Sequence, residues 1–375
     1  MRARELGIVI GTGTPGPFNA ITDVGGVRVG QTTLISGDGP LVVGQGPVRT
    51  GVTVVLPCDE VGTATLFAGC HRLNGNGELT GLEWVRESGL LTSPIAITNT
   101  NSVGVVRDAL VASAIGSQAA RGIYWSLPVV GETWDGALND INGMHVSTEH
   151  CWGAMASAAS GPVAEGNVGG GTGMICHGFK GGVGTSSRVV DARRGGYTVG
   201  ALVQANHGRR ERLTVAGVPV GVEIPVTDVP APAGPGPAPG AGSIIVVVAT
   251  DAPLLPHQCT RLAQRAGLGI ARVGGVGEHL SGDLFIAFAT GNVAPRGGGG
   301  SGGEPDRTRD PLTSRVTMLA DENMTALFDA VVDATEEAIV NALIAAETMT
   351  GRDGVTAHAL PHLRLVEAMQ KYGRV

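Results

Sequence analysis

The sequence has few aromatic residues, little charge and no apolar run long enough to cross a membrane. Phe, Trp and Tyr make up 3% of its 375 residues, and charged residues make up 16%. A packed core must therefore be built mainly from aliphatic side chains. No run approaches the roughly 20 apolar residues that span a bilayer. The formal net charge is −7 and no basic cluster is present, which leaves no electrostatic footprint for nucleic acid.

Cysteine motifs are also missing. The five cysteines are odd in number and form no CxxC pair: Cys58, Cys70, Cys151, Cys176 and Cys259. We interpret them as reduced, buried thiols of a cytoplasmic protein, with a cysteine nucleophile or a metal site as the alternative. We assign the nine histidines structural or surface roles, and we predict no metal and no cofactor. The first residues lack the apolar stretch and cleavage site of a secretory signal.

The sequence does contain short apolar runs rich in β-branched residues and bounded by Gly, Pro, Asn or Thr. Such runs predict buried strands, at 51–57, 94–98, 197–206, 243–250 and 283–290. Apolar residues at helical spacing predict helices at 106–120, 145–160, 253–271 and 321–349, the last with Gly351 as its terminator. Buried strands mixed with a few long helices indicate a layered α/β protein whose sheets are covered by helices.

Two glycine motifs match known functional patterns but lack the context that those patterns need. Residues 11–16 fit GxGxxG, yet Pro15 and the residues after it predict no helix that could face a pyrophosphate. Residues 299–303 fit the GxSxG nucleophile elbow, yet they lie in a polyglycine stretch instead of a strand–turn–helix. We therefore assign a function to neither motif.

The junction between Gly242 and Ser243 carries the strongest chemical signal. A Pro/Gly linker over 229–242 has no means of packing, and it leads directly into the apolar strand SIIVVVAT. An accessible carbonyl at Gly242 would thus stand next to a rigidly held hydroxyl at Ser243. Attack by that hydroxyl would give an ester through an N→O acyl shift, and hydrolysis of the ester would free the α-amine of Ser243.

That amine would give Ser243 a base of its own. An α-amine has a reference pKa of about 7.7–8.0, so much of it is neutral near physiological pH. A serine that carries its own base is a compact nucleophile. An ordinary domain linker in front of a strand also accounts for the same residues without any chemistry.

The stretch 242–258, GSIIVVVATDAPLLPHQ, resembles the newly formed amino terminus of one enzyme family. This is the DmpA/BapA family of L-aminopeptidase D-Ala-esterase/amidases and β-peptidyl aminopeptidases. Eight further blocks resemble the same family in the same order and extend the resemblance to nearly the whole chain: 20–34, 74–89, 94–104, 131–141, 169–188, 203–208, 281–292 and 336–354.

The resemblance implies a fold, a maturation step and an activity. The expected fold is an αββα sandwich that resembles N-terminal-nucleophile hydrolases but has different strand connectivity. One catalytic domain, 1–375, would cut itself into an α chain, 1–242, and a β chain, 243–375. The α–β heterodimers would form a homo-oligomer, a tetramer of heterodimers. The expected activity is the release of N-terminal residues from small peptides, amino-acid amides and esters.

The resemblance also implies roles for particular residues. Ser243 matches the nucleophile, and Asn206 matches the amide side chain of the oxyanion hole. Ser281 and Asp283 match a second serine and an acidic residue near the nucleophile's amine. Glu132 matches the acid that receives the substrate's amino group. These residue types suit the hydrolysis of an amide bond next to a free amine. An amide can donate to an oxyanion, a hydroxyl can relay a proton and a carboxylate can bind a protonated amine.

Trp134 departs from the family pattern. Family members often have Tyr at this place, and its hydroxyl is thought to help the oxyanion hole. Indole keeps an N–H donor, but it is bulkier and has no acceptor. The resemblance therefore leaves open what Trp134 contributes to substrate binding and how large the acyl pocket is.

Three alternatives remain open at this point. Preference for α-L, α-D or β-amino acids, the last as in β-peptidyl aminopeptidases, depends on the shape of the pocket. Acyl transfer of the ornithine acetyltransferase type is a second alternative, although those enzymes use Thr where this chain has Ser243. A non-enzymatic binding protein with a plain linker is the third, and it predicts that Ser243→Ala is tolerated.

Overall fold

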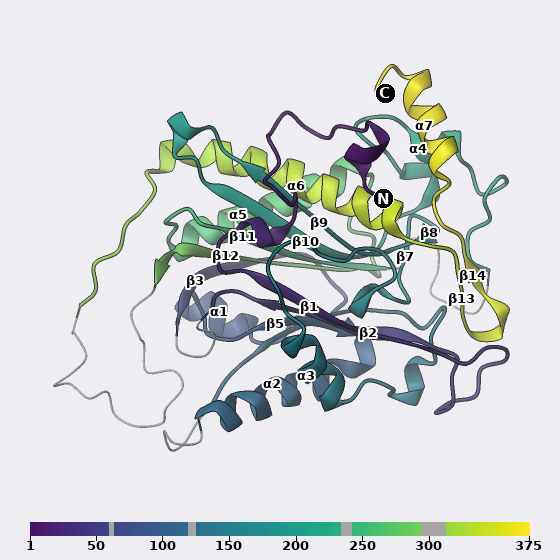
Figure 1. Ribbon diagram of the computed structural model, residues 1–375, viewed down its shortest axis with the longest axis horizontal. Helices are drawn as coiled ribbons and strands as arrows, with labels where there is room; N and C mark the ends of the chain where they lie inside the picture. Colours follow the sequence, from purple (N-terminus) through teal and green to yellow (C-terminus); the bar gives the residue numbers. More distant parts are fainter. Residues whose placement is uncertain (60–63, 119–124, 234–241, 294–312) are drawn as a thin grey trace.

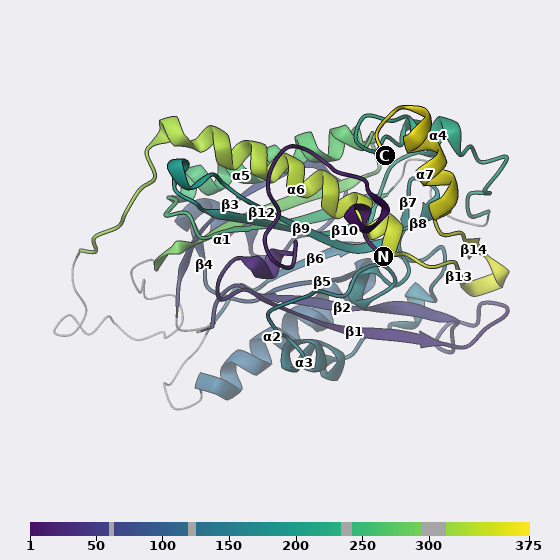
Figure 2. The ribbon, with the colours of Figure 1, turned by 45° about the horizontal axis from the view of Figure 1, so that its top comes forward.

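The computed structural model describes residues 1–59, 64–118, 125–233, 242–293 and 313–375. Two β-sheets lie face to face in the middle of the molecule, and helices cover the outer face of each sheet (Figure 1). α5 (Pro256–Arg272) and α6 (Met324–Ala345) lie on one side, and α2 (Val103–Gln118) and α3 (Thr148–Ala156) lie on the other (Figure 2). The predicted layered arrangement is thereby confirmed. No helix in these ranges is both long and apolar enough to cross a membrane.

The larger sheet has six strands in the order β4 (Leu90–Leu91), β3 (Leu66–Gly75), β12 (Gly282–Val293), β11 (Ser243–Thr250), β10 (Thr198–Asn206) and β9 (Gly182–Val189). The smaller sheet has four, in the order β1 (Arg28–Ser36), β2 (Val48–Leu56), β5 (Ile95–Asn99) and β6 (Val129–Thr133). β11 pairs in parallel with β12 and antiparallel with β10. Three segments that are distant in sequence therefore meet at each end of β11.

The remaining elements are short and lie around the sandwich. Two small hairpins pair β7 (Ile175–Cys176) with β8 (Phe179–Lys180) and β13 (Met349–Thr350) with β14 (Thr356–Ala357). The other α-helices are α1 (Leu82–Ser88), α4 (Val220–Glu223) and α7 (His362–Lys371).

The position of β11 explains why every residue between Ser243 and Thr250 is apolar. Ile244 and Val246 pack in the layer between the larger sheet and its two helices, whereas Ile245 and Val247 pack between the two sheets. A strand that is buried on both faces typically has a near-continuous run of apolar side chains. Burial of each of these side chains contributes about 1.5–3 kcal/mol. This burial holds Ser243, the first residue of the strand, in a defined place.

The predicted strands are all present, but several helix boundaries differ from the prediction. The helix expected over 321–349 runs from Met324 to Ala345, so Gly351 does not terminate it. Ala346 is extended, with ψ of 140°, and the chain after it enters the β13–β14 hairpin. Residues 229–233 of the predicted linker form no helix or strand. Residues 234–241 and the glycine stretch 299–303 lie outside the described residues.

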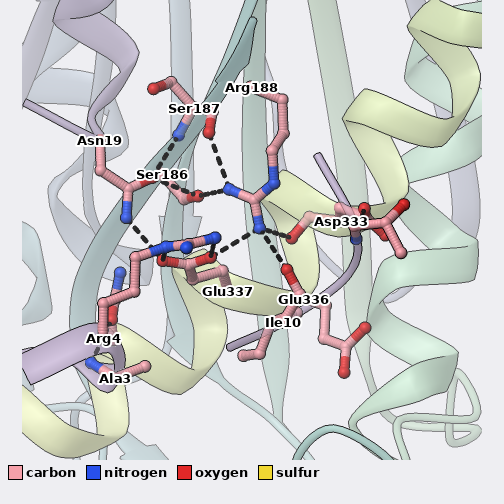
Figure 3. A network of polar contacts seen from close by, with 12 residues as sticks. Ala3, Arg4, Ile10, Asn19, Ser186, Ser187, Arg188, Asp333, Glu336 and Glu337 are labelled. Atoms are coloured by element: carbon pink, nitrogen blue, oxygen red, sulfur yellow. Dashed lines mark hydrogen bonds and ion pairs between the residues drawn. The ribbon is translucent and has the colours of Figure 1, made fainter. Parts of the chain in front are cut away.

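A buried polar network joins the N-terminal segment to β9 and α6 (Figure 3). Arg188 of β9 is 1% exposed and donates to one carboxylate oxygen of Glu337 at 2.6 Å. The other oxygen of Glu337 accepts from Arg4 at 2.9 Å and from Asn19 at 2.5 Å. Buried charges are tolerated when they are paired and hydrogen-bonded in this way. The network holds three segments together that are far apart in sequence.

Residues 11–16, which match the GxGxxG pattern, pass over this network as a loop. Arg188 donates to the carbonyl oxygen of Ile10 at 2.8 Å. Gly11 has φ of +68°, and an ideal Cβ on it would lie 1.9 Å from the carboxylate of Asp333. Glycine is therefore required here for close passage of the backbone over α6, and no α-helix starts at the motif.

Candidate active site

Ser243 lies between the ends of two neighbouring strands. Its register partners are Asn206, the last residue of β10, and Gly282, the first residue of β12. Strand pairing thus brings three of the segments singled out from the sequence to one end of the larger sheet. The side chain of Ser243 is buried, so the fold rather than solvent sets its surroundings.

The amide of Gly282 contacts both sides of the predicted scissile bond. Its N–H donates to Oγ of Ser243 at 3.0 Å and to the carbonyl oxygen of Gly242 at 3.2 Å. A donor in this position stabilises negative charge as it develops on the carbonyl oxygen. An ideal Cβ on Gly282 would lie 2.5 Å from the carbonyl oxygen of Asn76. The close approach of that backbone therefore requires glycine at position 282.

A cavity of about 550 Å³ opens beside Ser243. Gly242, Ser243, Glu132 and Trp134 all line it, together with Asn76, Gly77, Glu78, Thr100 and Leu280. Glu132 comes from β6 of the smaller sheet, so both sheets contribute to the walls. The structure thus brings the predicted cleavage site and the two predicted substrate-binding residues together.

Glu132 offers a buried carboxylate to this cavity. One oxygen accepts from the backbone N–H of Glu78 at 3.0 Å, and the other accepts from the hydroxyl of Thr100. Burial raises the pKa of Glu132, and the two hydrogen bonds oppose that rise. No basic side chain of the described ranges pairs with this carboxylate. The group is therefore free to receive a cationic ligand. Thr100 and Glu78 had been indicated only as members of larger sequence blocks.

The side chain of Asn206 is held in one orientation. Its Oδ1 accepts from the backbone N–H of Ile175 at 2.7 Å, and its Nδ2 donates to the carbonyl oxygen of Trp134 at 2.9 Å. A side-chain amide has two N–H donors, so one N–H is left for a further acceptor. Asn206 lies next to Ser243 through strand pairing, and its part in an oxyanion hole stays a prediction.

Ser281 and Asp283 form a hydrogen-bonded pair on either side of Gly282. Oγ of Ser281 donates to the carboxylate of Asp283 at 2.5 Å, and both side chains are buried. Burial raises the pKa of Asp283 to about 6, although the bond from Ser281 acts to lower it. Neither residue is among those that line the cavity in the uncut chain.

The indole ring of Trp134 packs against Gly136. An ideal Cβ on Gly136 would lie 2.5 Å from the indole ring, so a larger residue there would displace the ring. The indole lines the cavity, while the backbone carbonyl of Trp134 is the acceptor for Asn206. Trp134 therefore shapes the cavity with its side chain and fixes Asn206 with its backbone.

Two groups of buried polar side chains near this site had been indicated only as members of larger sequence blocks. Asp135 and Lys180 form the first group, and both are fully buried. Burial raises the pKa of Asp135 to about 7 and lowers the pKa of Lys180 to about 7. Cys176, His177 and His207 form the second group, with one ligand atom from each residue within 4.8 Å of the others. Cys176 and His207 are thirty-one positions apart, so only the fold brings them together.

The model of peptidase family S58 matches residues 19–357. The chain belongs to this family. It is 50% identical over 382 residues to the β-peptidyl aminopeptidase BapA of Sphingosinicella microcystinivorans, in an alignment that covers 100% of this chain and 93% of the relative. The predicted family and the predicted nature of the protein as a hydrolase are thus confirmed.

Solved structures support the same assignment to family S58. A β-aminopeptidase of Burkholderia sp. is 54% identical, with a TM-score of 0.89, over 100% of this chain and 99% of that one. The L-aminopeptidase D-Ala-esterase/amidase of Ochrobactrum anthropi is 45% identical, with a TM-score of 0.86, over 100% and 99%. The latter is described as a prototype of the serine aminopeptidases and a new variant of the Ntn hydrolase fold. The expected kinship with N-terminal-nucleophile hydrolases is therefore confirmed.

Proposed function

We propose that this chain is a self-activating serine aminopeptidase that releases N-terminal residues, β-amino acids included, from small peptides, amides and esters. The observation that carries the proposal is that Ser243 and the unpaired carboxylate of Glu132 line the same cavity. A nucleophile and an anchor for an ammonium group thus face one substrate. The names of the relatives, β-peptidyl aminopeptidase and β-aminopeptidase, support the inclusion of β-amino acids among the residues released.

Maturation starts with attack of Ser243 Oγ on the carbonyl carbon of Gly242. The C–N bond breaks, and the proton of the hydroxyl passes to the departing amine. Water then hydrolyses the ester and leaves a carboxylate on Gly242 and an amine on Ser243. The bond from the Gly282 N–H to the Gly242 carbonyl oxygen, at 3.2 Å, supports this step because it stabilises the developing oxyanion.

Peptide cleavage uses the same hydroxyl. The neutral α-amine of Ser243 takes the proton from Oγ as Oγ attacks the substrate carbonyl, and an acyl-enzyme forms as the leaving amine departs. Asn206 donates its remaining N–H to the oxyanion. Ser281, oriented by Asp283, carries the proton from the Ser243 amine to the leaving nitrogen. Water then hydrolyses the acyl-enzyme. Their positions around Gly282 and Ser243 support these roles.

The two parts remain one catalytic domain after the cut. β9 and β10 belong to the α chain, 1–242, whereas β11 and β12 belong to the β chain, 243–375, and β10 pairs with β11 over eight register positions. We further propose a cytoplasmic homo-oligomer, a tetramer of these heterodimers.

The direct test compares substrates with free and blocked amines. Purified protein is given β-alanyl and L-alanyl p-nitroanilides and their N-acetyl forms. The proposal predicts release of p-nitroaniline from the free amines only. Equal hydrolysis of the acetylated compounds would contradict the role given to Glu132. Failure to hydrolyse any of the four compounds would contradict the proposed activity.

A further inference from the structure

A Cys–His–His cluster lies next to the proposed oxyanion residue and outside the cavity. Cys176 ends β7, His177 follows it, and His207 directly follows Asn206 at the end of β10. One ligand atom from each of the three residues lies within 4.8 Å of the other two, and all three side chains are buried. In the described part of the chain no other group of His, Cys, Asp and Glu meets these conditions.

The imidazole of His177 is set up as a ligand. Its Nδ1 lies 3.0 Å from the carbonyl oxygen of Arg209, which can only accept, so Nδ1 carries the proton. Its Nε2 therefore carries the lone pair that could bind a metal ion. This nitrogen is buried and has no hydrogen-bond partner among the described residues. A proton on Nε2 would have no acceptor there, so the neutral ring is the favoured form. Metal-bound histidines typically donate their second ring N–H to a carbonyl in this way.

Cys176 and His207 already have the spacing of two ligands on one ion. Sγ of Cys176 and Nδ1 of His207 are 3.9 Å apart. Metal–sulfur and metal–nitrogen bonds of about 2.3 and 2.0 Å place such atoms about 3.5–3.8 Å apart. The widest separation in the cluster, at most 4.8 Å, needs to close by only about 1 Å.

The charge around the cluster selects the kind of ion. The charge of Lys180 acts on Cys176, Arg210 and Glu211 act on His177 with opposite signs, and the carboxylate of Asp135 acts on Lys180. One thiolate neutralises a monovalent ion, whereas a divalent ion would leave one net positive charge on a fully buried set of ligands. Thiolate with two imidazoles is also a set that copper accepts in trigonal geometry.

We propose that Cys176, His177 and His207 form a three-coordinate site for a monovalent thiophilic cation, copper(I). The ion binds sulfur as the thiol releases one proton to solvent, with no change of oxidation state. Binding draws the ligands together, and two of them adjoin the residues that hold the Asn206 side chain. Ile175, which precedes Cys176, donates to Asn206, and Asn206 itself precedes His207. An occupied site is therefore expected to slow peptide cleavage, a consequence that rests on the proposed function although binding does not.

The test is an anaerobic titration of the purified protein with copper(I) buffered by bicinchoninate. The wild type and Cys259→Ala, which removes an equally buried thiol elsewhere, are expected to bind one equivalent with the same affinity. Cys176→Ala is expected to bind at least 100-fold more weakly. Equal binding by the two alanine variants, or no binding by the wild type, would overturn the proposal.

A spectroscopic measurement keeps the proposal testable if Cys176→Ala fails to fold. X-ray absorption at the copper edge of the loaded wild type is expected to show one sulfur and two nitrogen ligands. A site with oxygen ligands, or with two sulfurs, would contradict the assignment. Zinc(II), offered under the same conditions, is expected to bind more weakly than copper(I), and tighter binding of zinc would overturn the choice of ion.

Discussion

An ideal Cβ on Gly242 would lie 2.0 Å from the carbonyl oxygen of Asn206, far inside van der Waals contact. Gly242→Ala must therefore push residue 242 away from β10, and its carbonyl then loses the hydrogen bond from Gly282. We expect self-cleavage to slow at least tenfold, because loss of one oxyanion donor typically costs about 10²–10³ in rate. The measurement is the fraction of uncut chain over time on a denaturing gel.

Gly267→Ala is the matched control for that variant. Gly267 lies in α5, and an ideal Cβ there meets nothing nearer than Phe285 at 3.6 Å. This control is expected to mature like the wild type. Maturation of Gly242→Ala at the wild-type rate would contradict the role given to the contact with Asn206.

Glu132→Gln tests the anchor for the substrate's amine. The amide keeps the size of the side chain but removes its charge, and a hydrogen bond to a charged group contributes about 1.5–3 kcal/mol. We expect kcat/KM for free-amine substrates to fall about 10- to 100-fold. Glu78→Gln, at an exposed acid that lines the same cavity, is the control and is expected to change little. Similar losses in both variants would show a general effect of charge instead of an anchor at Glu132.

Asp135 is expected to make the protein less stable as the pH rises through weakly acidic values. Burial raises its pKa from 3.8 to about 7 in the folded state. The folded state thus binds the proton more tightly than the unfolded state, so the free energy of unfolding falls as pH rises from about 4 to about 7. In Asp135→Asn, urea unfolding at pH 5 and pH 8 is expected to show a drop smaller by about 1–3 kcal/mol.

Glu165, whose pKa burial also raises to about 7, contributes a slope of the same sign in both proteins. The difference between wild type and variant therefore reports on Asp135 together with Lys180, whose pKa the carboxylate of Asp135 acts to raise. Identical slopes in the two proteins would show that Asp135 titrates near its ordinary value.

The network around Glu337 is expected to hold the α and β chains together after the cut. Arg4 and Arg188 precede the cleavage site, and Glu337 follows it (Figure 3). Glu337→Gln leaves the fully buried guanidinium of Arg188 without its counter-charge, which typically costs about 3–5 kcal/mol. The Tm should fall clearly, and the chains should separate at lower urea. Asp329→Asn, at an exposed acid on the same helix, is the control, and an equal Tm for both variants would refute the role of the network.

The sequence predicts the layers better than it predicts the site. Continuous apolar runs such as Ile244–Thr250 specify strands buried on both faces, and such strands require helices outside them. Helix ends were less predictable, because the apolar spacing that continues beyond Ala345 belongs to a hairpin. Pairing of Ser243 with Asn206 and Gly282 depends on strand order, which no local pattern encodes. Only the resemblance to a family connected Glu132 with Ser243, and nothing connected Cys176 with His207.

Intact-mass analysis and N-terminal sequencing of the wild type beside Ser243→Ala test the central claim most directly. We predict two fragments for the wild type, with a new amino terminus at Ser243, and one uncut, inactive chain for the variant. A full-length wild type that still cleaves peptides, or a Ser243→Ala variant that is cut or active, would contradict the account.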